Sequence, residues 1–272
     1  MSTITDKYGS FKKGIQSKHA ELLPNASYTI WDGLFSPEKY ANSLFRVLVM
    51  NREPYDIDKD SYDLVDTIQN DIKNGNPFWV NQNTLKNNLR DMLAVTSFLS
   101  DDNINAIDDA TIENRIKEYH ESDDAFNQAL LRMGYINIKK SNGQKKSNPK
   151  DLREHAILTW DVTQSQISFF NPSLIIGGNI VDKILGHKDM HINWGENLYT
   201  ESKYIKIFTL KIGAKTFPFI DSYHLSANSY GEKGNRKPMS EYYKELILAL
   251  RNVENNNPGY WATRRNLSVF ED

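Results

Sequence analysis

The chain of 272 residues contains no cysteine. This absence excludes disulfide bonds, thiolate metal sites, iron–sulfur clusters and cysteine nucleophiles, and it fits the reducing environment of the cytoplasm. No apolar run is long enough to cross a bilayer, and the first residues, MSTITDKYGSFKKG, lack the apolar core of a signal peptide. We therefore expect a cytoplasmic protein that has no membrane partner.

The motifs of several common sites are also missing. The paired glycines Gly177 and Gly178 do not form the GxGxxG pattern of a dinucleotide site, and the sequence contains neither a P-loop nor a GxSxG elbow. His187 and His191 belong to no HExxH motif and have no third ligand at a suitable spacing. We expect neither a metal ion nor a cofactor.

An excess of positive charge is lacking as well. The 33 basic and 35 acidic side chains give a net charge of −2, which disfavours a protein that coats nucleic acid without specificity. Lysine and arginine gather locally at residues 139–153 and 233–237. Each cluster is either a solvated loop or part of a local basic groove.

The apolar content of 39% and the aromatic content of 11% are those of a globular protein. We find no internal repeat and expect a single domain over residues 1–272, with an irregular arm at residues 1–25 and a helical insertion at residues 84–133.

Short apolar strands are predicted to alternate with helices along the chain. This alternation predicts an α/β fold, a three-layer α/β/α sandwich with a mostly parallel central sheet of about four core strands. The predicted strands are 47–50, 135–138, 174–176, 204–212 and 217–221, and the predicted helices are one starting at Ser36-Pro37, 64–74, most of 84–133 including 125–133, 152–169 with Ile157 facing inward, and 240–251 with Ser240 as its cap.

Polar residues follow four of these strands. They are Asn51–Asp56, Asn137, Gly177–Asn179 and Ser222–Ser229. The carboxyl ends of parallel strands share one edge of a sheet, where open α/β folds bind ligands. The sequence therefore predicts a cleft that combines a carboxylate, an amide, a glycine turn and a histidine loop.

The order of these segments resembles the uracil-DNA glycosylase superfamily. That family carries a Gly-Gln-Asp-Pro-Tyr-like motif after its first core strand, where this chain has Asn51–Tyr55, and a His-Pro-Ser-like motif after its last, where this chain has His224–Ser226. Asn137 matches the base-reading asparagine, and Leu174–Gly178 matches the strand and glycine turn between them. The chain departs from the family pattern at Asn51, Glu53, Asp56 and Leu225.

The resemblance implies that the chain flips a base out of DNA and cleaves its bond to the sugar. Glu53 would orient water or stabilise the cationic sugar, with Asp56 as the alternative. The other interpretation of Glu53 is that it caps the next helix or pairs with Arg52. His224 would donate to the departing base, unless it is a core histidine bonded to the backbone.

Further residues are candidates for holding the base and the DNA backbone. Asn137 would read the base edge, or it is a turn residue, and Tyr55 would wall the pocket. Phe78 and Trp79 would stack on the base, or they belong to the core. The candidates for phosphate contacts are Ser226, Asn228, Ser229, Arg236, Lys237, Lys139 and Lys140.

Together these inferences predict a monofunctional DNA glycosylase that hydrolyses the N-glycosidic bond of a uracil-like or modified pyrimidine and leaves an abasic site. Lyase activity is not expected without a well-placed lysine nucleophile. The expected partner is DNA, and we expect a monomer without an obligatory protein partner. The alternatives are a glycosylase that removes hypermodified phage bases, a non-catalytic nucleic-acid-binding protein on the same fold, and an enzyme outside nucleic acids.

Overall fold

The fold is taken from a computed structural model of the chain. It describes residues 2–26, 29–53, 61–74, 83–101, 103–141, 148–223, 227, 229–232 and 235–270.

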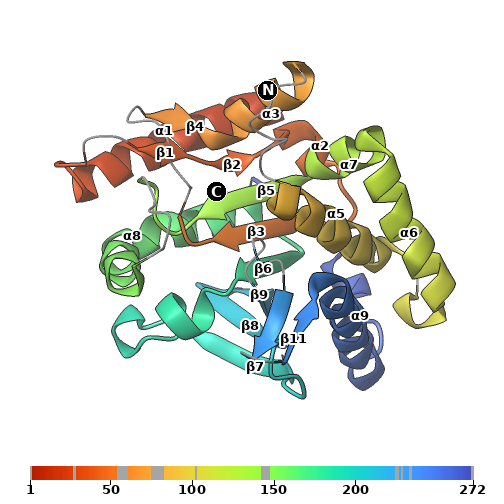
Figure 1. The fold of residues 1–272 in the computed structure, drawn as a ribbon. Coiled ribbons are helices and arrows are strands. Elements are labelled where there is room, and N and C mark those ends of the chain that lie inside the picture. The colour runs from red at the N-terminus through yellow and green to blue at the C-terminus, as the bar shows by residue number, and fades with distance from the viewer. Residues whose placement is uncertain are drawn as a thin grey trace.

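A mixed sheet of seven strands forms the centre of the described fold, in the order β2-β5-β3-β6-β9-β8-β7 (Figure 1). Its parallel part consists of β5 (Met133–Asn137), β3 (Val47–Asn51), β6 (Leu174–Gly178) and β9 (Lys215–Ser222). The antiparallel part consists of β2 (Gly33–Leu34), β8 (Lys206–Ile212) and β7 (Trp194–Tyr199).

The sheet has more strands than the four expected core strands. Antiparallel strands flank the parallel part on both sides, β2 beside β5 and β8 with β7 beside β9. β8 and β9 form a hairpin in which Ile212 pairs with Lys215, and Gly213 turns the chain with a φ of 57°. Such a two-residue loop suits antiparallel strands. The sequence therefore predicted the four parallel strands and also β8, as residues 204–212, but not the antiparallel strands β2 and β7.

The parallel strands read as continuous apolar runs because both of their faces are covered. In β3, Val47 and Val49 belong to one buried cluster, whereas Leu48 and Met50 belong to another. Every residue of β3, β5 and β6 is buried. The two clusters therefore lie on opposite faces of the sheet.

Different helices complete the two clusters (Figure 1). The first contains residues of α3 (Leu64–Asn74), α5 (Asn83–Ser97), α6 (Asp109–Glu121), α7 (Asp123–Leu130) and α9 (Met239–Asn256). The second contains residues of α2 (Pro37–Ala41) and α8 (Pro149–Phe170), against which α1 (Ile4–Leu22) packs. None of the helices in the described ranges is both long and apolar enough to span a membrane.

Smaller elements complete the described chain. They are the parallel pair β1 (Ile30–Trp31) and β4 (Tyr62–Asp63), the hairpin β10 (Ser229–Glu232) and β11 (Asn235–Pro238), the 3-10 turns η1 (Phe98–Ser100), η2 (Ile104–Ala106), η4 (Lys188–Met190) and η5 (Ala262–Arg264), and the π-helical turn η3 (Val181–Leu185).

The expected irregular arm at residues 1–25 is instead the 19-residue helix α1. Thr3 accepts a hydrogen bond from the Asp6 amide, and the Asp6 side chain accepts one from the Thr3 amide, which forms a capping box. Phe11 stacks on Phe169 of α8 with ring centroids 3.8 Å apart. The arm prediction was wrong because it overlooked this cap and the apolar face behind it.

Four details of the predicted elements also differ. Ile157 is 45% exposed rather than inward-facing. α9 begins at Met239, so Ser240 lies inside its first turn instead of capping it. α7 ends at Leu130 because the chain must turn into β5 at Met133. Residues 231–238, expected as a loop, contain strands of the β10–β11 hairpin.

Candidate functional site

Four residues form a row across the carboxyl ends of the parallel strands. Asn51 of β3 pairs in register with Asn137 of β5, and Gly178 of β6 pairs with Ser222 of β9. A Cβ atom on Gly178 would lie 2.3 Å from Asn51 Oδ1, so these two residues are in direct contact. The row therefore brings the four predicted strand ends to one edge of the sheet.

The row spans the position in the sheet at which the order of successive strands reverses. The second parallel strand, β5, lies on one side of β3, and the third, β6, lies on the other side. Connections that leave a strand in opposite directions open a crevice at its carboxyl end, which is where open α/β sheets bind ligands. The end of β3 occupies this position.

The Asn51 carboxamide is buried, with only 4% of the residue exposed. Its Nδ2 donates to the Tyr135 hydroxyl, and burial raises the pKa of Tyr135 to about 12, although the bond to Asn51 opposes the shift. The Asn51 Oδ1 atom has no hydrogen-bond partner among the described residues. It is a free acceptor beside Gly178.

Asn137 is fully buried, yet both Oδ1 and Nδ2 of its carboxamide lack a partner in the described structure. Its main chain, by contrast, is well bonded: the Asn137 amide donates to Asp32 Oδ2 at 2.7 Å, and the Lys140 ammonium donates to the Asn137 carbonyl at 3.1 Å. Hydrogen bonds therefore fix the Asn137 backbone, whereas the two polar atoms of its carboxamide have no partner among the described residues.

The Glu53 carboxylate lies just past the end of β3 and is 5% exposed. Its Oε2 is 3.5 Å from Lys139 Nζ, which also donates to Asp151 Oδ2 at 2.6 Å. Its Oε1 has no partner among the described residues. Arg52 instead donates to the Asn179 carbonyl at 3.0 and 3.2 Å, so Glu53 pairs with Lys139 rather than with Arg52.

The edge thus presents a donor and three acceptors that the described protein leaves unpaired. Buried polar atoms in folded proteins nearly always have partners, and each exception calls for an explanation such as water, an ion or a functional role. A carboxamide offers one donor and one acceptor to a ligand, and a carboxylate offers acceptors only.

Replacing Gly178 by alanine is expected to lower the free energy of unfolding by about 1–3 kcal/mol, because the new methyl group collides with the Asn51 oxygen in a packed site. Urea unfolding followed by tryptophan fluorescence measures the change. Gly14→Ala is the control: nothing lies within 4 Å of its Cβ position in α1, so a gain of up to about 1 kcal/mol is expected. Equal stability of Gly178→Ala and the wild type would contradict the contact.

Several predicted site residues lie outside the described residues. They are Tyr55, Asp56, Phe78, Trp79, His224, Ser226 and Asn228. The described residues on either side of the histidine segment are anchored: the Tyr223 amide donates to the Tyr242 hydroxyl at 3.0 Å, and Asn88 donates to the Ala227 carbonyl at 2.9 Å. The segment therefore starts from β9, two strands away from the end of β3.

Lys139 and Lys140 were expected to contact phosphates, and the structure contradicts this. Lys140 is 1% exposed and donates to Asp32 Oδ1 at 2.6 Å, and Lys139 is 8% exposed between Asp151 and Glu53. Buried ammonium groups need carboxylate partners. Asp32 and Glu53 lie far from the two lysines in sequence, and Asp151, although it lies within the basic cluster, gives no sequence sign that it pairs with Lys139.

The remaining candidates for phosphate contacts lie on the β10–β11 hairpin. Ser229 pairs with Pro238, and Arg236 and Lys237 are exposed on β11. Lys237 Nζ lies 3.6 Å from Glu241 Oε2 and 3.7 Å from Glu245 Oε1. These carboxylates weaken the attraction of Lys237 for a phosphate, whereas no ion pair of Arg236 is present among the described side chains.

Asp221 is a candidate that the sequence reasoning missed, although it ends a predicted strand. Burial and the nearby Asp182 raise the pKa of its carboxyl to about 7, while Lys206 and the Val181 amide oppose the shift. Its Oδ1 has no partner in the described structure. Side chains alternate along β9, so Asp221 lies on the same face of the sheet as Phe219. The side chain of Ser222, which belongs to the row, lies on the opposite face.

Asp221→Asn is expected to stabilise the protein by about 2 kcal/mol at pH 8 and to have little effect at pH 4. The raised pKa means that stability is lost as pH rises from about 4 through 7, because the folded state then carries a buried anion. Each pKa unit corresponds to about 1.4 kcal/mol of stability. Because Asp221 is partly exposed, we expect roughly half of the destabilisation that the full pKa shift would give. Thermal unfolding across this range measures it, with the exposed Asp161→Asn as the control; parallel pH profiles of Asp221→Asn and the wild type would contradict it.

The described structure also contains a cavity of about 540 Å³ at the opposite edge of the sheet, where Val47 and Met133 begin β3 and β5. Its rim includes Lys39 and Arg132. Among the described residues, no group of three His, Asp or Glu side chains could hold a metal ion. None of the residues that line this cavity belongs to the row.

No protein-family model, curated protein or solved structure matches the chain.

Proposed function

We propose that the chain is a DNA glycosylase that flips a uracil-like or modified pyrimidine from the helix and hydrolyses its bond to the sugar. The observation that carries the proposal is the set of buried atoms of Asn51, Glu53 and Asn137, at the ends of β3 and β5, that have no partner among the described residues. The helices that pack on both faces of the parallel strands are compatible with the three-layer sandwich of the superfamily that the motifs resemble.

In the proposed reaction, Asn137 binds the polar edge of the flipped base through its donor and its acceptor. Glu53 directs a water molecule toward the anomeric carbon, or stabilises the positive charge that develops on the sugar. His224 donates to the departing base, whose oxygen becomes negative as the bond breaks. Exposed Arg236 contacts the phosphate backbone and fixes the register.

The test is to incubate the protein with duplexes that carry uracil, cytosine, thymine or hypermodified pyrimidines and then to cleave abasic sites with alkali. We expect strand breaks with the wild type, and a loss of at least about 100-fold in rate for Glu53→Gln, Asn137→Ala and His224→Ala. Glu38→Gln is the matched control, because this exposed carboxylate lies at the opposite edge of the sheet. DNA binding without abasic sites for any base would overturn the proposal.

A second candidate is a nucleic-acid-binding protein that recognises a base without hydrolysis. The contact between Lys139 and Glu53 favours it, because the ammonium holds one oxygen of the carboxylate that would otherwise face water. The same assay separates the two candidates, since binding that weakens in Asn137→Ala without any base release supports recognition alone.

A further inference from the structure

Asp32, Asn137 and Lys140 form a closed ring of hydrogen bonds around the backbone of Asn137, the residue of the row that ends β5. The Asn137 amide donates to Asp32 Oδ2 at 2.7 Å, the Asn137 carbonyl accepts from Lys140 Nζ at 3.1 Å, and Lys140 Nζ donates to Asp32 Oδ1 at 2.6 Å. One ion pair thus binds both backbone polar groups of a single residue.

The position of the ring follows from the end of a strand. On one side of β5, the Ile138 amide donates to the Asn51 carbonyl at 2.9 Å and continues the pairing with β3. On the other side, β2 pairs with β5 only through Gly33 and Leu34. Asp32, one residue before β2, therefore supplies a side-chain acceptor where the sheet offers no further backbone acceptor.

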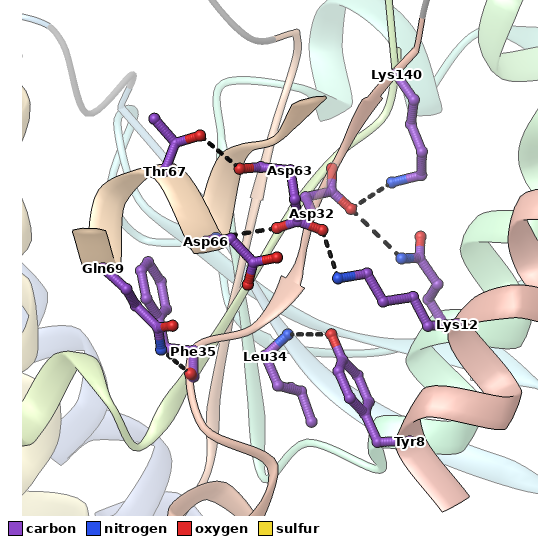
Figure 2. A network of polar contacts seen from close by, with 11 residues as sticks. Tyr8, Lys12, Asp32, Leu34, Phe35, Asp63, Asp66, Thr67, Gln69 and Lys140 are labelled. Atoms are coloured by element: carbon purple, nitrogen blue, oxygen red, sulfur yellow. Dashed lines mark hydrogen bonds and ion pairs between the residues drawn. The ribbon is translucent and has the colours of Figure 1, made fainter. Parts of the chain in front are cut away.

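The ring is buried and supported from α8. The side chains of Asp32 and Lys140 are 0% and 1% exposed. Gln166 donates to Asp32 Oδ1 at 3.4 Å, and the Lys140 amide donates to His155 Nε2 at 3.3 Å. Figure 2 shows Asp32 and Lys140 facing each other, with the separate ion pair of Lys12 and Asp63 nearby.

Stability alone does not explain this pair. Buried ion pairs cost much of their attraction in lost hydration, and apolar residues of the same volume often stabilise a protein as well. An apolar pair, however, would bond neither polar group of the Asn137 backbone. What the charged pair supplies, and an apolar pair would not, is a fixed backbone at a residue whose own carboxamide has no partner among the described residues.

We propose that Asp32 and Lys140 are positioning residues, which fix the Asn137 backbone so that its carboxamide meets the base in one place. The inference rests on the proposed function, because it takes Asn137 as the residue that binds the base. Enzymes need such supports, since a displacement of about 1 Å at a reacting group can cost 100-fold in rate.

The experiment compares the double variant Asp32→Asn/Lys140→Met with the wild type. This variant removes both charges together and keeps an oxygen that accepts from the Asn137 amide, so the fold is expected to persist. Base release is measured in both proteins and again with Asn137→Ala added to each. Lys12→Met/Asp63→Asn is the matched control, because it removes a neighbouring ion pair that does not contact Asn137.

We expect the double variant to reduce kcat by about 10- to 100-fold, and to reduce it less than 2-fold when Asn137 is already alanine. The control pair should change kcat less than 2-fold in either background. An equal fold-loss of kcat in the wild-type and Asn137→Ala backgrounds would show that Asp32 and Lys140 act on the fold generally. That result would overturn the positioning role and leave the glycosylase proposal standing.

A second readout separates this failure from failure of the proposed function. If the wild type releases no base from any duplex, the proposed function fails, and ¹⁵N relaxation of the Asn137 amide groups then decides the positioning role. Greater mobility of the Asn137 backbone in Asp32→Asn/Lys140→Met, and not in the control, supports it. Unchanged mobility overturns it.

Discussion

Replacing Asp32 by alanine is expected to lower the free energy of unfolding by about 3–5 kcal/mol, because it leaves a buried ammonium without a counter-ion. Lys140 is 1% exposed and cannot reach water without displacing its surroundings. The Asn137 amide loses its acceptor as well. In a chain of this size, each kcal/mol corresponds to about 2–4 °C, so the melting temperature should fall by roughly 10 °C.

Urea unfolding at pH 7, followed by tryptophan fluorescence, measures this loss. The control is Asp32→Asn/Lys140→Met, in which no charge remains unpaired, and we expect it to lose no more than about 2 kcal/mol. The asymmetry is the informative result, since a single substitution should be worse than the double one. If Asp32→Ala and the double variant were equally stable, the ammonium would have another partner or would reach water.

The parallel strands could be predicted because each is a short apolar run covered on both faces, as Val47–Met50 shows. Their polar ends could be predicted to meet because parallel strands end at one edge. The ring around Asn137 could not be predicted. Asp32 and Lys140 are 108 residues apart, and a lysine in a basic stretch gives no sign that it is buried.

Helix α1 shows a different kind of failure, because its signals were present in the sequence. Ile4, Tyr8, Phe11, Ile15 and His19 recur at helical spacing, and Thr3 begins a capping box. Gly9 and Gly14 interrupt the pattern and lower the intrinsic helix propensity. Packing of this face on α8 overrides that propensity, and packing is a property of the fold rather than of the segment.

Acidification from pH 6.5 to 4 is expected to destabilise the protein through two buried histidines beneath the ring. His19 and His155 have ring centroids 5.7 Å apart and are 1% and 8% exposed. Burial and the charge of Lys140 lower the pKa of His19 to about 4; burial, the neighbouring His19 and the two lysines lower that of His155 to about 3. His155 Nε2 accepts from the Lys140 amide, which requires a neutral ring.

The sign follows from the unfolded state, in which both histidines titrate near 6.5. Below that pH the unfolded chain binds protons that the folded protein excludes, so stability is complete above pH 6.5 and is lost as pH falls toward the folded pKa values. At about 1.4 kcal/mol per pKa unit, the two imidazoles together lower the free energy of unfolding by roughly 3–6 kcal/mol at pH 4.

Asp221 acts in the opposite direction over the same range, because its carboxyl becomes neutral as pH falls through about 7. The Asp221→Asn background removes this contribution, and chemical unfolding between pH 7 and 4 is then compared in this background with and without a substitution of His155. Adding His155→Gln, which keeps an acceptor for the Lys140 amide, should remove about half of the acid loss. An unchanged acid slope would show that His155 already binds a proton in the folded protein, and the ring behind Asn137 would then carry an additional buried charge at neutral pH.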